Sequence, residues 1–240
     1  MVQRIKNPNQ PKSPNLKLIK TPKLYIQPND PSLPHESPDV EIPSVISELT
    51  HNFEQYHVNR RATIHPDWIK LTCYTTRIST TVDTLRSQVK GGVTSKPVSL
   101  HTCLCCIISL GLPQIQTRSV VNELGDLIIA FQRRPKQGTE LESYINDFLK
   151  SKVYAKAEQG DSISIVVTPV VKDQIAQISG DTGLTASGVA TIAMYACLSQ
   201  QDEAPNVHKK RWEDSFDETL AMLECKLSAS KAMLGVLDGE

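Results

Sequence analysis

One cluster of side chains in the sequence has the residue types of a metal site or of a nucleophilic centre. His101, Cys103, Cys105 and Cys106 fall close together, and Cys103 and Cys106 would share one face of a helix. A closed zinc site needs four convergent ligands, usually from two spaced pairs, and no second CxxC or HxxxH pair is present. We therefore interpret these thiols as small buried side chains and expect no metal and no other cofactor.

Catalytic chemistry has little support elsewhere in the chain. Ser, His and Asp occur without a nucleophile elbow, and no glycine-rich phosphate loop is present. A cysteine nucleophile would need a positioned base that the pattern does not identify. The sequence thus favours a binding protein over an enzyme, with a metal or thiol enzyme that uses His101 and Cys103 as the least favoured alternative.

Residues 161–200 predict a strand followed by two helices. Apolar and polar residues alternate from 162 to 167, with the period of two that is typical of a strand. Pro169 suits the first turn of a helix, Gly183 can end that helix, and Thr185 or Ser187 can cap the next one. A strand with two short helices cannot bury its own apolar faces, so a second copy is required.

Residues 68–112 repeat this order. β-branched and aromatic residues predict a strand over residues 71–78. Thr80 or Thr81 can cap a helix that a Gly-Gly pair terminates, and Ser99 can cap a second helix. Internal repetition of a unit that cannot stand alone indicates that the two copies pair within one chain.

This repeated pattern, with the letters GLTAS at the second helix–helix corner, resembles the ribbon-helix-helix family of DNA-binding proteins. The resemblance implies a mainly α fold with a two-stranded antiparallel ribbon that enters the major groove. With both copies in one chain, it implies a tandem ribbon-helix-helix pseudo-dimer with additional helices. Such a chain is similar to accessory DNA-binding proteins of conjugative plasmid relaxosomes of the TraY type, and to the overdrive-binding protein of T-DNA transfer.

In this family the strand side chains that face away from the helices read bases. Arg77 is the strongest candidate, because a guanidinium can bond two acceptors of one guanine; a solvated residue or a salt bridge is the alternative. The second strand lacks a basic or amide side chain there, so we expect asymmetric recognition. Carried over by alternation, the base-reading positions are Cys73, Thr75, Arg77, Ser162, Ser164 and Val166.

The resemblance also assigns phosphate contacts to the N-terminus of the second helix in each copy. Free N–H groups and the positive end of the helix dipole attract anions there. Plain helix capping is the alternative, and the two roles can coexist. The positions are Lys96, Ser99 and His101 in the first copy, and Thr185, Ala186 and Ser187 in the second.

Charge is unevenly distributed in a chain whose 26 basic and 26 acidic residues balance. Residues 1–24 carry six basic residues and no acid, residues 56–112 carry seven basic against two acidic, and residues 199–240 carry five against nine. Such blocks favour a phosphate-facing region and a separate acidic region. A solvated surface with chance clustering is the alternative.

The chain divides into five expected parts. Residues 1–43 hold nine of the fifteen prolines and are expected to form a disordered tail with a basic first half. Residues 44–112 form the first copy, with a preceding helix over 42–57, and residues 113–160 form an insert of two helices. Residues 161–200 form the second copy. Residues 201–240 contain a polar linker over 201–208 and an acidic C-terminal helix.

The C-terminal helix carries an apolar seam with alternating steps of four and three residues, which is polar at one position, Ser230. Its members are Phe216, Leu220, Leu223, Leu227, Leu234 and Leu237. Packing on the chain's own domain is the favoured role for this seam. The other role would make the chain an antitoxin or adaptor whose C-terminal helix binds a partner protein.

The predicted function is sequence-preferring binding of double-stranded DNA. The chain would act as a relaxosome accessory factor of a plasmid or mobile element, or as a transcriptional repressor. Expected partners are duplex DNA, a relaxase, partition or other DNA-processing protein, and further copies of the chain on DNA. No stretch approaches the length of a membrane span and the N-terminus lacks a signal-peptide core, so we expect a cytoplasmic protein without membrane contact.

Overall fold

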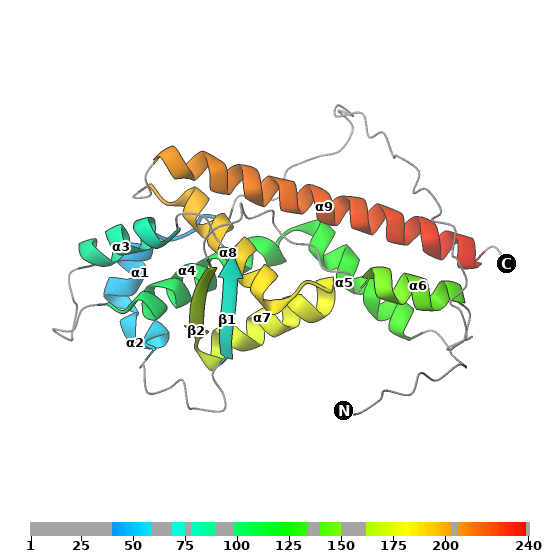
Figure 1. The fold of residues 1–240 in the computed structure, drawn as a ribbon, viewed down its shortest axis with the longest axis horizontal. Coiled ribbons are helices and arrows are strands. Elements are labelled where there is room, and N and C mark those ends of the chain that lie inside the picture. Colours follow the sequence, from blue (N-terminus) through cyan, green and yellow to red (C-terminus); the bar gives the residue numbers. More distant parts are fainter. Residues whose placement is uncertain are drawn as a thin grey trace, which may run out of the picture. The chain divides into compact units, whose positions relative to one another are not determined.

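The computed structural model describes a mainly helical fold with one two-stranded antiparallel sheet (Figure 1). Residues 1–39 of the expected tail lie outside the described residues. All the described residues fall in one unit, residues 36–240. They are 40–58, 69–74, 78–89, 98–133, 140–149, 162–202 and 206–238.

The order strand, helix, helix occurs twice along the chain, as predicted. We call these two segments the first and second repeats. The first contains β1 (Ile69–Tyr74), α3 (Ile78–Gln88) and α4 (Leu100–Gln116); the second contains β2 (Ser162–Val167), α7 (Pro169–Thr182) and α8 (Ala186–Gln200).

The two strands pair antiparallel, from Ile69 opposite Val167 to Tyr74 opposite Ser162. One face of this ribbon is apolar and buried, and includes Leu71 and Ile165. Each strand contacts the second helix of the other repeat, because α4 lies against β2 and α8 lies against β1. The ribbon therefore joins the two repeats into one core.

Helices α4 and α8 form the centre of that core and pack closely on each other. A Cβ atom added at Gly111 would overlap the carbonyl oxygen of Ala193. Glycine is thus required for the close approach of the two helix backbones. Every residue of α8 from Gly188 to Ser199 is buried, and the central residues Val189, Ile192 and Met194 are almost fully buried.

Local chemistry explains where the repeat helices begin and end. The Ser99 side chain caps α4 by accepting from the Thr102 N–H at 3.0 Å. Thr185 caps α8 by accepting from the Gly188 N–H at 3.1 Å. The predicted caps Ser99 and Thr185 are confirmed, whereas Ser187, the other predicted cap, lies inside α8. Gly183 ends α7 with a left-handed φ of 68°, which a residue without a Cβ adopts at little cost.

The remaining helices surround this core. The two insert helices predicted within residues 113–160 are confirmed, and both contact the long helix α9. Figure 1 shows α9 running along α8 and α5. Their bounds are α1 (Val45–His51), α2 (Phe53–Tyr56), α5 (Ser119–Gln132), α6 (Glu140–Leu149) and α9 (Asn206–Asp238).

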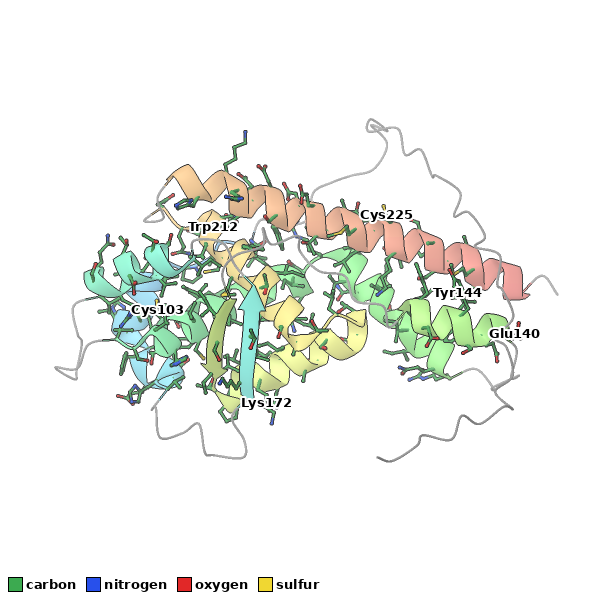
Figure 2. All side chains as sticks on the ribbon, in the orientation of Figure 1. Cys103, Glu140, Tyr144, Lys172, Trp212 and Cys225 are labelled. Carbon is green, nitrogen blue, oxygen red and sulfur yellow. The ribbon has the colours of Figure 1, made fainter. Side chains whose placement is uncertain are left out.

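The apolar seam of α9 packs inward. Phe216, Leu223, Leu227 and Leu234 are buried, and α9 contacts α5, α6 and α8. Trp212, labelled in Figure 2, is also buried near the start of this helix. The favoured role of the seam, packing on the chain's own domain, is therefore confirmed for these residues.

Two buried glutamine side chains hold the segment that precedes α1. Gln201 accepts from the Val45 N–H at 2.7 Å and donates to the Pro43 carbonyl at 3.1 Å. Gln114 donates to the Val40 carbonyl at 3.0 Å. Side chains at the ends of α4 and α8 thus provide partners for backbone groups just before and at the start of α1.

Three predicted boundaries were wrong for identifiable reasons. Ile78 begins α3 rather than ending a strand, because it is buried with Val82 and Leu85 at helical spacing. The predicted caps Thr80 and Thr81 consequently lie inside that helix. Helix α4 continues beyond residue 112, since Ile115 extends its buried face.

Two further predictions were wrong at the ends of the unit. The single helix expected over residues 42–57 is broken at Asn52, whose side chain donates to Glu48 and whose backbone is not helical. Helix α9 already begins at Asn206, inside the linker expected over residues 201–208.

Candidate nucleic-acid interface

The outer face of the ribbon carries exposed polar side chains. Lys70 and Thr72 of β1 and Ser164 of β2 are exposed, and the register places Thr72 directly opposite Ser164. This face offers hydrogen-bond donors and acceptors to a partner, whereas the inner face is buried in the core.

Cys73 lies on the inner face, which corrects its predicted role in reading bases. It is fully buried, and its thiol lies 3.8 Å from the Ser187 carbonyl oxygen of α8. Burial raises the pKa of the Cys73 thiol to about 11. The alternation of β1 is therefore opposite to the predicted one, because Leu71 and Cys73 face the helices.

Val166 occupies the predicted outer face, opposite Lys70, but is only 3% exposed. Its backbone N–H donates to Nδ1 of His101 at 3.4 Å. The first turn of α4 therefore lies against this end of β2. A direct base contact by the Val166 side chain does not fit this burial, which corrects a second predicted base-reading position.

The N-termini of the two second helices lie beside opposite strands of the ribbon. His101 of α4 contacts β2 at Val166, and Ser187 of α8 contacts β1 at Cys73. In the register, Val166 and Cys73 lie near opposite ends of the ribbon. The structure thus brings the start of each of these helices to a different strand, with the predicted phosphate-contacting residues Ser99 and His101 at α4 and Thr185 and Ser187 at α8.

The capping hydroxyls are already used within the chain. Ser99 Oγ accepts from the Thr102 N–H and shares a hydrogen bond of 2.8 Å with the Thr102 hydroxyl. Thr185 Oγ1 accepts from the Gly188 N–H, and the Ser187 carbonyl accepts from the Thr191 hydroxyl at 2.7 Å. The alternative role of helix capping is confirmed for Ser99 and Thr185. Ala186 occupies the first position of α8, where backbone N–H groups have no acceptor within the helix.

Three other predicted site residues, Thr75, Arg77 and Lys96, lie outside the described residues. Another basic residue of the first repeat, Arg86, is occupied by internal contacts. Its guanidinium donates to the Val98 carbonyl at 2.8 Å and to the Asp83 carboxylate at 2.7 Å. Arg86 therefore fixes the entry to α4 and is not an outward-pointing cation.

Sequence reasoning missed Lys70 and Thr72. The signal was present, since Ile69, Leu71 and Cys73 alternate with Lys70 and Thr72, the same period of two that identified β2. The predicted strand began at Leu71, two residues late, and ended at Ile78, the first residue of α3. The alternating residues were therefore assigned to the wrong faces of the strand.

The cysteine cluster is buried in α4, as predicted. Cys103, Cys105 and Cys106 are fully buried, and Figure 2 shows Cys103 on α4. Burial raises the pKa of Cys103 to about 12 and that of Cys106 well above its ordinary value. Neutral thiols are therefore favoured. Among the described residues, no group of three or more His, Cys, Asp or Glu side chains is arranged to hold a metal ion.

No protein-family model matches the chain, and no curated protein or solved structure is significantly similar to it. Within the part of the chain that the structure describes, no single helix has both the length and the apolar character of a membrane span.

Proposed function

We propose that this protein binds double-stranded DNA with a sequence preference, as a tandem ribbon-helix-helix protein whose two halves lie in one chain. Three observations support the fold assignment: the repeated order of strand and two helices, the antiparallel pairing of the two strands, and the packing of α4 on α8. The observation that carries the function is the outer face of the ribbon, with Lys70, Thr72 and Ser164 exposed.

The chemistry of this face suits base edges in the major groove. That groove admits a two-stranded ribbon. The Lys70 ammonium can donate to the O6 and N7 acceptors of guanine. The hydroxyls of Thr72 and Ser164 can both donate and accept, so they tolerate more than one base. The inner face cannot take this role because it is buried against the helices.

The flanking helix ends suit the DNA backbone. The first turn of α4 contacts β2 at Val166, and the first turn of α8 contacts β1 at Cys73; we expect DNA phosphates to pass near these two helix ends. Backbone N–H groups at Ala186 and Ser187 and the positive end of the α8 dipole attract an anion. The Thr185 hydroxyl accepts a hydrogen bond within the helix and retains its own proton for a phosphate oxygen.

Two cellular roles remain within this proposal: a relaxosome accessory factor of a plasmid or mobile element, and a transcriptional repressor. Mapping the preferred site distinguishes them, since a site at a transfer origin supports the first role and a site at a promoter supports the second. The adaptor alternative depended on the apolar seam of α9. Buried Leu223 and Leu227 show that this seam belongs to the chain's own core.

A selection from randomised duplexes, followed by titration of the enriched sequences, tests the proposal. We expect enrichment of a defined motif and an affinity that falls steeply as salt rises, because phosphate contacts release counterions. Equal retention of all duplexes, or binding abolished by a non-nucleic polyanion such as heparin without any enriched motif, would contradict sequence-preferring binding.

A further inference from the structure

We propose that a hollow between α5 and α7 binds an organic cation: a guanidinium or ammonium group on an apolar stem, supplied by an arginine or lysine side chain of another protein or by a free polyamine. This inference goes beyond DNA binding. The hollow shares no residue with the ribbon or with the first turns of α4 and α8.

The hollow has a volume of about 280 Å³ and lies where the last turn of α7 packs on the middle of α5. These two helices are in contact along the fold (Figure 1). Gly125 permits the close approach, since a Cβ atom added there would lie 3.0 Å from the Cβ atom of Asp181. Asn122, Asp126 and Ile129, which share a face of α5 by helical spacing, form the wall opposite Asp181.

Two carboxylates in this hollow have no counter-charge. Within the part of the chain that the structure describes, the side chains of Asp126 and Asp181 form no ion pair and no hydrogen bond. Glu123, on a neighbouring position of α5, differs because it accepts from Lys231 of α9 at 2.6 Å. The hollow therefore presents carboxylate acceptors that are open to a cation from outside the chain.

The position of Asp181 is unfavourable for the helix that contains it. Asp181 is the second-last residue of α7, and the C-terminal end of a helix carries partial negative charge and carbonyl groups without helical donors. Asp126 places a second negative charge on the same hollow. Because local rules of stability are broken mainly where function requires it, this arrangement points to a cationic ligand that would relieve the repulsion.

The lining suits an organic cation better than a bare metal ion. Calcium prefers more oxygen ligands than two carboxylates and one carboxamide provide, and the described residues include no group of three or more metal-ligating side chains. Ile129, which is 38% exposed, offers an apolar surface for an alkyl stem. A guanidinium has N–H donors for both carboxylates and for the Asn122 carbonyl oxygen.

Titration of the full chain with two matched peptides, followed by NMR, tests this site. The peptides are capped Gly-Arg-Gly and its counterpart with citrulline, which keeps the shape of arginine without its charge. We expect only the arginine peptide to shift the backbone amide signals of residues 122–129 and 181. Spermidine, titrated in parallel, distinguishes the two sources: tighter binding than the arginine peptide identifies a free polyamine, and weaker binding identifies a protein side chain.

Asp181→Asn should weaken binding of the arginine peptide by about tenfold, because it removes a charged acceptor. It should also raise the melting temperature by about 1 to 3 °C, since the side chain no longer opposes the helix dipole. Lost binding then does not arise from unfolding. Asp173→Asn is the matched control. Asp173 is exposed on the same helix but outside the hollow, so this variant should bind the peptide as the wild type does.

Two results would overturn the inference. One is that neither the arginine peptide nor spermidine shifts the signals of α5 and α7 in the wild type. The other is that the wild type, Asp181→Asn and Asp173→Asn bind the cation equally well. The proposed function fails in a different experiment, in which the wild type selects no DNA motif. Asp181→Asn should select the same motif as the wild type, because Asp181 lies outside the ribbon.

Discussion

The two repeats share their framework but differ in the surface that they present. Each second helix begins with a side-chain cap, Ser99 or Thr185, that accepts from the N–H three residues later. The inward-facing residues of each strand, such as Leu71 and Ile165, are buried against α4 and α8. On the outer face, however, Lys70 of β1 is exposed, whereas Val166, its partner on β2, is buried. Burial and capping constrain the framework of both repeats, whereas the exposed positions are free to diverge.

The links between the helices also differ. In the second repeat Gly183 turns the chain sharply between α7 and α8, and the Leu184 N–H donates to the Thr182 hydroxyl at 3.2 Å. In the first repeat α3 and α4 are separated by residues 89–99. A side-chain contact, Arg86 to the Val98 carbonyl, ties the two helices there. A glycine turn thus links the two helices of the second repeat, whereas a hydrogen bond from the Arg86 side chain connects those of the first.

The largest effect is expected where the two repeats meet. Gly111→Ala should destabilise the fold by about 3 kcal/mol, because the new Cβ would overlap the Ala193 carbonyl and force α4 away from α8. Denaturation with urea measures the change. Gly180→Ala is the control, since a Cβ at Gly180 meets no atom within 4 Å and should stabilise α7 by up to about 1 kcal/mol. Equal stabilities for the two variants would show that the repeats do not cross this closely.

A smaller effect is expected at the turn of the second repeat. Gly183→Ala should cost about 1 to 2 kcal/mol, because alanine is disfavoured at the φ of 68° observed there. Gly183→Asn should recover part of this loss, since asparagine tolerates the left-handed region better. Thermal denaturation of both variants provides the measurement. If alanine and asparagine behave alike, the backbone conformation does not control the turn.

The caps permit a direct comparison between the repeats. Ser99→Ala and Thr185→Ala should each lower the free energy of unfolding by about 1 kcal/mol, because each removes the acceptor of a helical N–H. If both caps also contact phosphate, both variants should weaken DNA binding by more than stability alone explains. Ser99→Asp and Thr185→Asp separate the two roles, since aspartate preserves the cap but repels phosphate.

The order of strands and helices could be predicted because each repeat contains strong local signals. The period of β2, the helix start at Pro169 and the caps Ser99 and Thr185 depend on residues that are close in sequence. The outer face of β1 was assigned wrongly because the predicted strand, residues 71–78, included the first residue of α3. Ile78 is apolar in either a strand or a helix, and only its packing with α3 decides between them.

Contacts between distant segments had no local signal. Gly111 lies in an apolar helical run, and nothing in that run indicates that Ala193 approaches it. Gln201 was interpreted as linker, yet its side chain is buried and bonds to Val45 and Pro43. Pair packing and long-range hydrogen bonds depend on the assembled fold, so single-sequence patterns did not reveal them.

The smallest expected effect is on the reactivity of the thiols, which should follow their burial. At pH 8, native protein should be alkylated at Cys225, which is exposed on α9 (Figure 2). Cys73, Cys103 and Cys106 should remain unmodified, because they are buried and their raised pKa values keep them neutral. Mass spectrometry after digestion identifies the modified residues.

Two comparisons make the thiol experiment decisive. Unfolding in urea should allow alkylation of all six cysteines, which shows that protection arises from the fold. Raising the pH should also lower the free energy of unfolding, because burial disfavours the thiolate in the folded state. The stabilising contribution of the buried thiols is complete below the pKa that they have in the unfolded chain, and it is lost as the pH rises through their pKa in the folded protein. Rapid alkylation of Cys103 or Cys106 in the native protein at pH 8 would instead indicate a reactive thiol in the first repeat. That result would restore the thiol-enzyme alternative and give the two repeats different chemistry in their cores as well as on their surfaces.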